Sequence, residues 1–108
     1  MNFLINIETL RRYFAADAVY VTQHTAKRFR ERGIRMKDIK TAIAGGRIIE
    51  QYENDTPFPS CLICGPSTSE NALHVVVSDE GSASSIITCY FPDPNLWDNN
   101  FTIRKKEG

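Results

Sequence analysis

The sequence predicts an α+β fold in which N-terminal helices pack on one face of an antiparallel sheet of about four strands. Apolar residues recur at three- and four-residue steps up to about Ala44, and at two-residue steps after Ile48. Helical segments followed by strands with short connections are typical of this class. With 108 residues, 42% of them hydrophobic, the chain has the size of a single domain, which we place at residues 1–108.

Three helices are expected in the N-terminal half. The second is the best delimited, because Thr22 is a good cap at its start and Gly33 follows its end. The segment Asp17–Val21 before it is a short connector that can be extended. The three helices are expected at residues 6–16, 22–32 and 36–44.

The C-terminal half is expected to form consecutive strands. Turn-forming residues separate the strands, among them the Asn- and Pro-rich segment 54–59 and the segment 79–83. Short connections favour an antiparallel meander. The four strands are expected at residues 48–52, 60–65, 73–78 and 86–91.

Charge is unevenly distributed, although 13 Lys and Arg balance 13 Asp and Glu. Gln23–Lys40 holds seven Lys and Arg and two acids, whereas Ile48–Ile103 holds eight acids and no Lys or Arg. Zero net charge excludes a uniformly basic nucleic-acid binder and an acidic disordered tail. It leaves a locally basic surface, which is either a solvated helix face or a binding site for an anion.

No run of about 18 apolar residues is present, so no membrane span is expected. The first residues lack the basic and apolar regions of a signal peptide, and we therefore expect a cytoplasmic protein.

His24, Arg28 and Arg32 follow one another at four-residue steps and therefore share one face of the second helix. Two guanidinium groups beside an imidazole suit phosphate binding and proton transfer. Metal-independent phosphodiester cleavage needs such groups, because the attacking hydroxyl must lose a proton and the phosphate charge must be stabilised. Alternatively, the arginines pair with acids of the sheet, and His24 caps the helix or packs.

His74 and Tyr90 lie on the third and fourth expected strands, and they share a surface if these strands pair. In the other interpretation, His74 is half-buried and hydrogen-bonded within the domain. Trp97, Phe101 and Tyr90 either stack on bases or, as we favour, close the core near the chain end.

The cysteines could form a zinc site, because Cys61 and Cys64 have a spacing that can bind zinc and His74 and Cys89 could be the other two ligands. A three-residue offset within a strand, however, points the thiols of Cys61 and Cys64 to opposite faces. An odd cysteine count in the cytoplasm also argues against a disulfide. We expect small buried hydrophobic residues, with no metal and no cofactor.

Several spaced motifs resemble one family in one order. They are Thr22–Ile34, Asp38-Ile39, Ala42-Ile43, Gly46–Tyr52, Asp55–Leu62, Leu73–Val76 and Ile86–Trp97. Together they resemble domain-of-unknown-function family 4258 over about residues 19–105, with the first helix, before residue 19, outside the matched motif. Thr25 and Cys64 depart from the usual Ala and aliphatic residue of that family.

The resemblance implies the superfold shared by barnase, colicin nucleases and RelE-type toxins. It further implies the toxin of a type II toxin–antitoxin pair, acting on RNA such as ribosome-bound mRNA, with a zinc-finger antitoxin of the YgiT type as partner. In this hypothesis the chain is a metal-independent RNA endonuclease. His24, His74 and Tyr90 are its catalytic residues, and Arg28 and Arg32 bind phosphate. The alternative is a non-catalytic interaction domain that binds a protein partner or RNA without cleavage.

Overall fold

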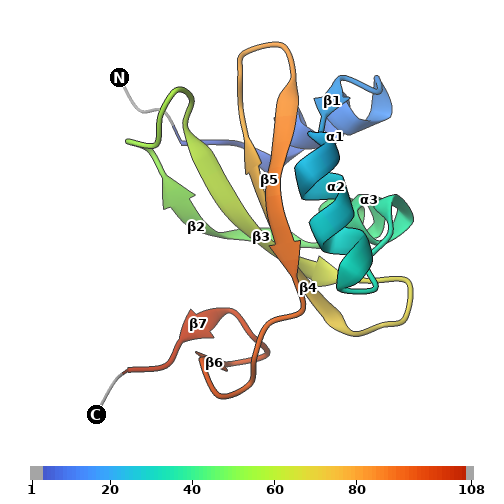
Figure 1. Ribbon diagram of the computed structural model, residues 1–108. Coiled ribbons are helices and arrows are strands. Elements are labelled where there is room, and N and C mark those ends of the chain that lie inside the picture. The colour runs from blue at the N-terminus through green and yellow to red at the C-terminus, as the bar shows by residue number, and fades with distance from the viewer. Residues whose placement is uncertain (1–3, 107–108) are drawn as a thin grey trace.

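The computed structural model, which describes residues 4–106, has the predicted α+β class (Figure 1). All three expected helices and all four expected strands are present, with bounds that differ by one or two residues. The helices are α1 (Ile7–Ala15), α2 (Gln23–Glu31) and α3 (Met36–Gly45). The strands are β1 (Val19–Tyr20), β2 (Arg47–Tyr52), β3 (Ser60–Pro66), β4 (Ala72–Ser78), β5 (Ser84–Tyr90), β6 (Trp97–Asp98) and β7 (Ile103–Arg104).

Strands β2 to β5 form the predicted antiparallel meander, but the sheet is larger than expected. The short connector before α2 forms β1, which pairs in parallel with β5, so the main sheet is mixed and has the order β1-β5-β4-β3-β2. With only two residues, β1 is too short to show an alternating pattern in the sequence. Strands β6 and β7 add a separate two-stranded sheet, which we call the C-terminal hairpin.

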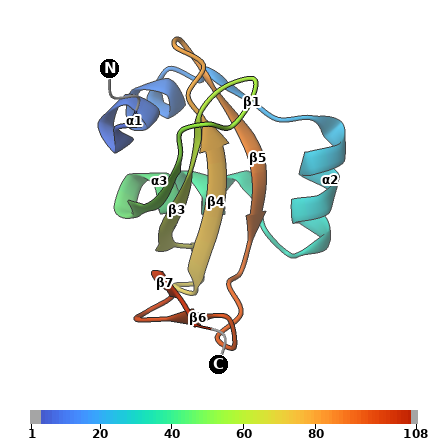
Figure 2. The same ribbon diagram turned by 90° about the vertical axis from the view of Figure 1, so that its left-hand side faces the viewer.

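One face of the sheet packs against α1 and α3 and forms the core. Alternate residues of the central strands point to this face, including Ile63, Val75 and Cys89, all at most 1% exposed. Figure 2 shows α3 behind the sheet and α2 beside β5. Phe29 of α2 is 4% exposed and belongs to the same core, so it fixes the helix along that edge.

The opposite face of the sheet is partly covered by the C-terminal hairpin. The hairpin lies at the end of the sheet where β5 finishes (Figures 1 and 2). The loop after β2 and the turn between β4 and β5 stand at the other end. Within residues 4–106, the longest helix has ten residues, and no helix has the length and apolar character that a membrane crossing requires.

Candidate nucleic-acid interface

The basic residues of α2 are presented to solvent as predicted. Thr22 begins the helix, with its Oγ1 accepting a hydrogen bond from the Thr25 amide at 3.1 Å. His24, Arg28 and Arg32 are exposed, and we call this group the helix face. The opposite side of α2 is buried through Phe29, so the helix holds these groups toward water.

The positive charge of the helix face is not neutralised by acids of the sheet. Ion pairs in the described part of the chain join Glu8 to Arg11, Glu50 to Arg104 and Asp98 to Lys105. None of these pairs involves α2. The interpretation in which Arg28 or Arg32 pairs with the acidic strands is therefore not what the structure shows, and the positive charge of the helix face is exposed to solvent.

Arg32 has a second role, because it fastens the end of α2 to β5. Its Nη1 donates a hydrogen bond to the Cys89 carbonyl oxygen at 2.6 Å and lies 3.4 Å from Thr88 Oγ1. Pairing of β1 with β5 stops at Ser85, so Cys89 lies on a strand edge that β1 does not cover. Arg32 satisfies a carbonyl there, and its remaining N–H groups stay available as donors.

His74 lies inside the protein, beneath the C-terminal hairpin. Its side chain is fully buried, its Nε2 is 2.7 Å from the Phe101 carbonyl oxygen, and its Nδ1 is 3.3 Å from the Tyr90 hydroxyl. A carbonyl oxygen only accepts hydrogen bonds, so Nε2 carries the proton and Nδ1 accepts from Tyr90. Both nitrogens of the neutral ring therefore have protein partners.

Burial keeps His74 neutral and Tyr90 protonated. Desolvation lowers the pKa of His74, and the hydrogen bond to Phe101 and the charge of Glu50 offset this effect only in part. Burial also raises the pKa of Tyr90. The ring of Trp97 meets His74 edge-on at 4.5 Å between centroids and is 5% exposed, so it closes this end of the core, as the sequence favoured.

A charged pair continues this cluster at the edge of the sheet. Arg104 donates from Nε and Nη2 to the two carboxylate oxygens of Glu50, at 2.8 and 3.1 Å, and its guanidinium lies 4.7 Å from the Trp97 ring centroid. The Tyr52 hydroxyl donates to Glu50 as well. Burial alone would raise the pKa of Glu50, but these hydrogen bonds outweigh it and the pKa is lowered. Burial and the bond to Glu50 raise the pKa of Tyr52 to about 12.

We call this second group the hairpin network. Its members are Glu50, Tyr52, His74, Tyr90, Trp97, Phe101 and Arg104. Sequence reasoning missed Glu50, Tyr52 and Arg104. The alternation of Glu50 and Tyr52 on β2 was a usable signal for a shared face. Arg104 is 54 positions from Glu50, and no local pattern joins them.

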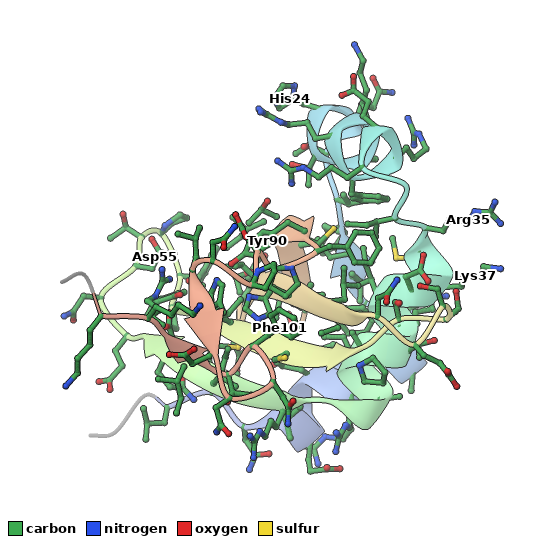
Figure 3. The ribbon with its side chains drawn as sticks, turned by 90° about the horizontal axis from the view of Figure 1, so that it is seen from below. His24, Arg35, Lys37, Asp55, Tyr90 and Phe101 are labelled. Atoms are coloured by element: carbon green, nitrogen blue, oxygen red, sulfur yellow. The ribbon has the colours of Figure 1, made fainter. Side chains whose placement is uncertain are left out.

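The five predicted site residues do not converge on one point. His24 stands in the first turn of α2 and lies apart from Tyr90 and Phe101 (Figure 3). The sequence had suggested His74 as an acid–base counterpart of His24, and Tyr90 as a group that orients the scissile phosphate. The structure corrects this expectation, because His74 is sealed beneath the hairpin and Tyr90 is hydrogen-bonded to it.

Two of the three cysteines are small core residues, and the third lies on the other face of the sheet. Cys61 and Cys89 are buried, and burial raises their pKa values to about 12 and about 11. Cys64 points to the opposite face, where its Sγ lies 3.9 Å from the Asn100 carbonyl oxygen. In the part of the chain that the structure covers, no three His, Cys, Asp or Glu side chains gather in a metal-binding arrangement.

A family model described as "domain of unknown function (DUF4258)" matches residues 21–91, about two thirds of the chain. The chain belongs to this family. The matched segment contains α2, α3 and β2 to β5, and therefore the helix face, His74 and Tyr90. It leaves out α1 and the C-terminal hairpin. No curated protein and no solved structure matches the chain.

Proposed function

We propose that this DUF4258 member binds RNA along the helix face and cleaves it without a metal ion, as the toxin of a type II toxin–antitoxin pair in the cytoplasm. The observation that carries the proposal is that His24, Arg28 and Arg32 are exposed on one side of α2, with no ion pair to the acidic strands. Guanidinium groups arranged on a rigid helix can contact successive phosphates. Ribosome-bound mRNA is one such substrate.

The proposed chemistry assigns the proton transfer to His24. Of the two histidines in the chain, His74 is buried, so His24 is the imidazole that a bound strand can reach. His24 removes the proton of a ribose 2′-hydroxyl, the 2′-oxygen attacks phosphorus, and the bond to the 5′-oxygen breaks. Arg28 lies one turn away and stabilises the charge that develops on the phosphate. The leaving oxygen takes a proton from water, and a cyclic phosphate remains.

Cleavage of RNA in the presence of EDTA tests the proposal. General base catalysis contributes about 10²- to 10⁴-fold, so His24→Ala should lower the cleavage rate by at least about 100-fold. Arg28→Ala should weaken RNA binding and reduce its salt dependence, because one phosphate contact is lost. Arg12→Ala, an exposed arginine on α1, is the matched control and should leave both unchanged.

All three side chains are exposed, so each variant is expected to fold like the parent protein, and circular dichroism checks this. Cleavage by His24→Ala at the parent rate would remove His24 from the mechanism. Absence of RNA binding by the parent protein at low salt would overturn the whole proposal.

A non-catalytic interaction domain is the second candidate, and a groove at the end of the sheet opposite to the C-terminal hairpin favours it (Figure 1). The groove has a volume of about 380 Å³ and includes Asp55 and Glu80, neither of which forms an ion pair among residues 4–106. Phe58 and Ile87 line it and are 40% and 43% exposed. The acidic and apolar residues of this groove suit a basic protein segment, for which an antitoxin of the YgiT type is the candidate partner. Binding of that partner without any RNA binding would favour this function.

A further inference from the structure

Tyr20 is an exposed aromatic residue at the start of the helix face. It ends β1, stands two residues before Thr22, the cap of α2, and is 63% exposed. Its strand neighbour Val19 packs against the core, whereas Tyr20 points to the opposite side, with Ser85 as its partner in the sheet register. The core therefore gives no reason for an aromatic ring at this position.

A small pocket lies beside this ring. It has a volume of about 140 Å³ and is lined by Tyr20, Val21, Thr22, Ser85 and Ile86. Pockets for drug-sized ligands have volumes of roughly 300–1,000 Å³, so this pocket has room for one small planar group. The pocket lies where the pairing of β1 with β5 ends, at Tyr20 and Ser85, just before α2 begins.

The two hydroxyl groups of the pocket already donate their protons within the protein, so they can only accept hydrogen bonds from a ligand. Ser85 Oγ donates its proton to Glu80 Oε2 at 2.6 Å, and Thr22 Oγ1 donates its proton to Thr25 Oγ1 at 3.0 Å. Each oxygen keeps a lone pair for a ligand donor. Cytosine offers an amino group with two N–H donors where uracil offers a carbonyl oxygen, and uracil has only one ring N–H donor on this edge, so two acceptors match cytosine better. The pocket therefore favours cytosine over uracil.

We propose that the Tyr20 pocket is a nucleobase subsite, in which one unpaired base of a single-stranded RNA stacks on the Tyr20 ring while the adjoining phosphates lie on the helix face. This inference rests on the proposed function and extends it, because it names single-stranded RNA as the substrate class. Aromatic side chains next to basic residues bind single strands in this way, since the ring contacts the base and the cations contact the backbone. A paired base in a duplex cannot enter the pocket.

Fluorescence anisotropy with four labelled probes of equal length tests the subsite. The probes are oligo(rC), oligo(rU), an abasic ribose-phosphate strand and an RNA duplex. The parent protein should bind oligo(rC) most tightly. Tyr20→Ala should weaken oligo(rC) binding by about 5- to 150-fold, the range for stacking of one base, and leave the abasic strand and the duplex unchanged. Tyr20→Phe keeps the ring and should bind like the parent.

Arg28→Ala separates this inference from the proposed function, because it should weaken all four probes alike. If Tyr20→Ala binds every probe as the parent does while Arg28→Ala weakens all of them, the base subsite is wrong and the RNA-binding proposal stands. Equal affinity of the parent for oligo(rC) and oligo(rU) would overturn the acceptor role of the two hydroxyl groups. A parent protein that binds none of the probes would overturn both proposals.

Discussion

Lowering the pH below 6.5 should destabilise this protein through His74. The side chain is fully buried, donates from Nε2 to the Phe101 carbonyl oxygen and accepts at Nδ1 from Tyr90. A proton on Nδ1 would displace the hydrogen bond from Tyr90 and place a charge beneath the hairpin. The folded protein therefore holds the neutral ring, and the pKa of His74 is lowered from its ordinary value of 6.5.

The sign and size of the effect follow from proton linkage. Between the lowered pKa of folded His74 and the ordinary value of 6.5, the unfolded chain binds a proton that the folded chain does not. The free energy of unfolding thus has its full value above pH 6.5 and falls as the pH drops, with a limiting slope of about 1.4 kcal/mol per pH unit. For a domain of this size, each 1 kcal/mol lowers Tm by about 4–8 °C. Glu50 and Asp38 have lowered pKa values and contribute only at more acidic pH.

Urea unfolding between about pH 7.5 and about pH 5, followed by the fluorescence of Trp97, measures this slope. Trp97 is the single tryptophan of the chain and contacts His74 directly, so it reports on the hairpin. His74→Gln retains a donor for Phe101 without titrating and should show a nearly flat profile. His24→Gln is the matched control, because His24 is exposed and its loss should leave the parental slope.

A parent protein whose unfolding free energy is constant between about pH 6.5 and about pH 5 would refute this reasoning, since a buried neutral imidazole must then be absent. The same conclusion would follow if His24→Gln removed the slope and His74→Gln kept it.

Three further outcomes are expected. Gly46→Ala should lower the free energy of unfolding by about 3 kcal/mol or more, because the new Cβ would lie 2.4 and 2.5 Å from two backbone carbonyl oxygens. Gly33→Ala should lower it by only about 1–2 kcal/mol, because the position has open space and the loss comes from its φ of +76°. Thermal unfolding compares the two variants. Asp38→Asn should cost about 1–3 kcal/mol near neutral pH, because Asp38 is buried and its oxygens accept from three donors. The lowered pKa of Asp38 means that this difference is present above pH 3.8 and disappears as the pH falls through the folded value, which acid titration of both proteins checks. Arg104→Lys should lower the free energy of unfolding by about 1 kcal/mol and shift the Trp97 emission maximum to longer wavelength, because the two hydrogen bonds to Glu50 are lost while the positive charge remains. An unchanged emission maximum would contradict this.

The fold class could be predicted from the sequence because its signals are local. The change of apolar period after Ala44 separates helices from strands, and Thr22 and Gly33 delimit α2 within one residue at each end. The pairing of β1 with β5 could not be predicted in this way. It joins Tyr20 to Ser85, and two residues carry no period of their own.

The same distinction between local and long-range contacts applies to the residues of the candidate interface. The helix face could be predicted because residues four apart on a helix always share a side, and only the burial of Phe29 was needed to turn that side outward. The register of β4 and β5 brought His74 and Tyr90 together, as their alternation indicated. Whether that pair faces water or the interior depends on the C-terminal hairpin, which no strand pattern specifies.

Local sequence patterns thus specify the helices, the meander and the cationic side of α2, since each depends on neighbours within about one helical turn or one strand. Tertiary structure alone decided that Arg32 fastens α2 to Cys89, that Arg104 reaches Glu50, and that His74 is buried. The physical reason is that these contacts join residues 27 to 57 positions apart, and their formation depends on how whole elements pack.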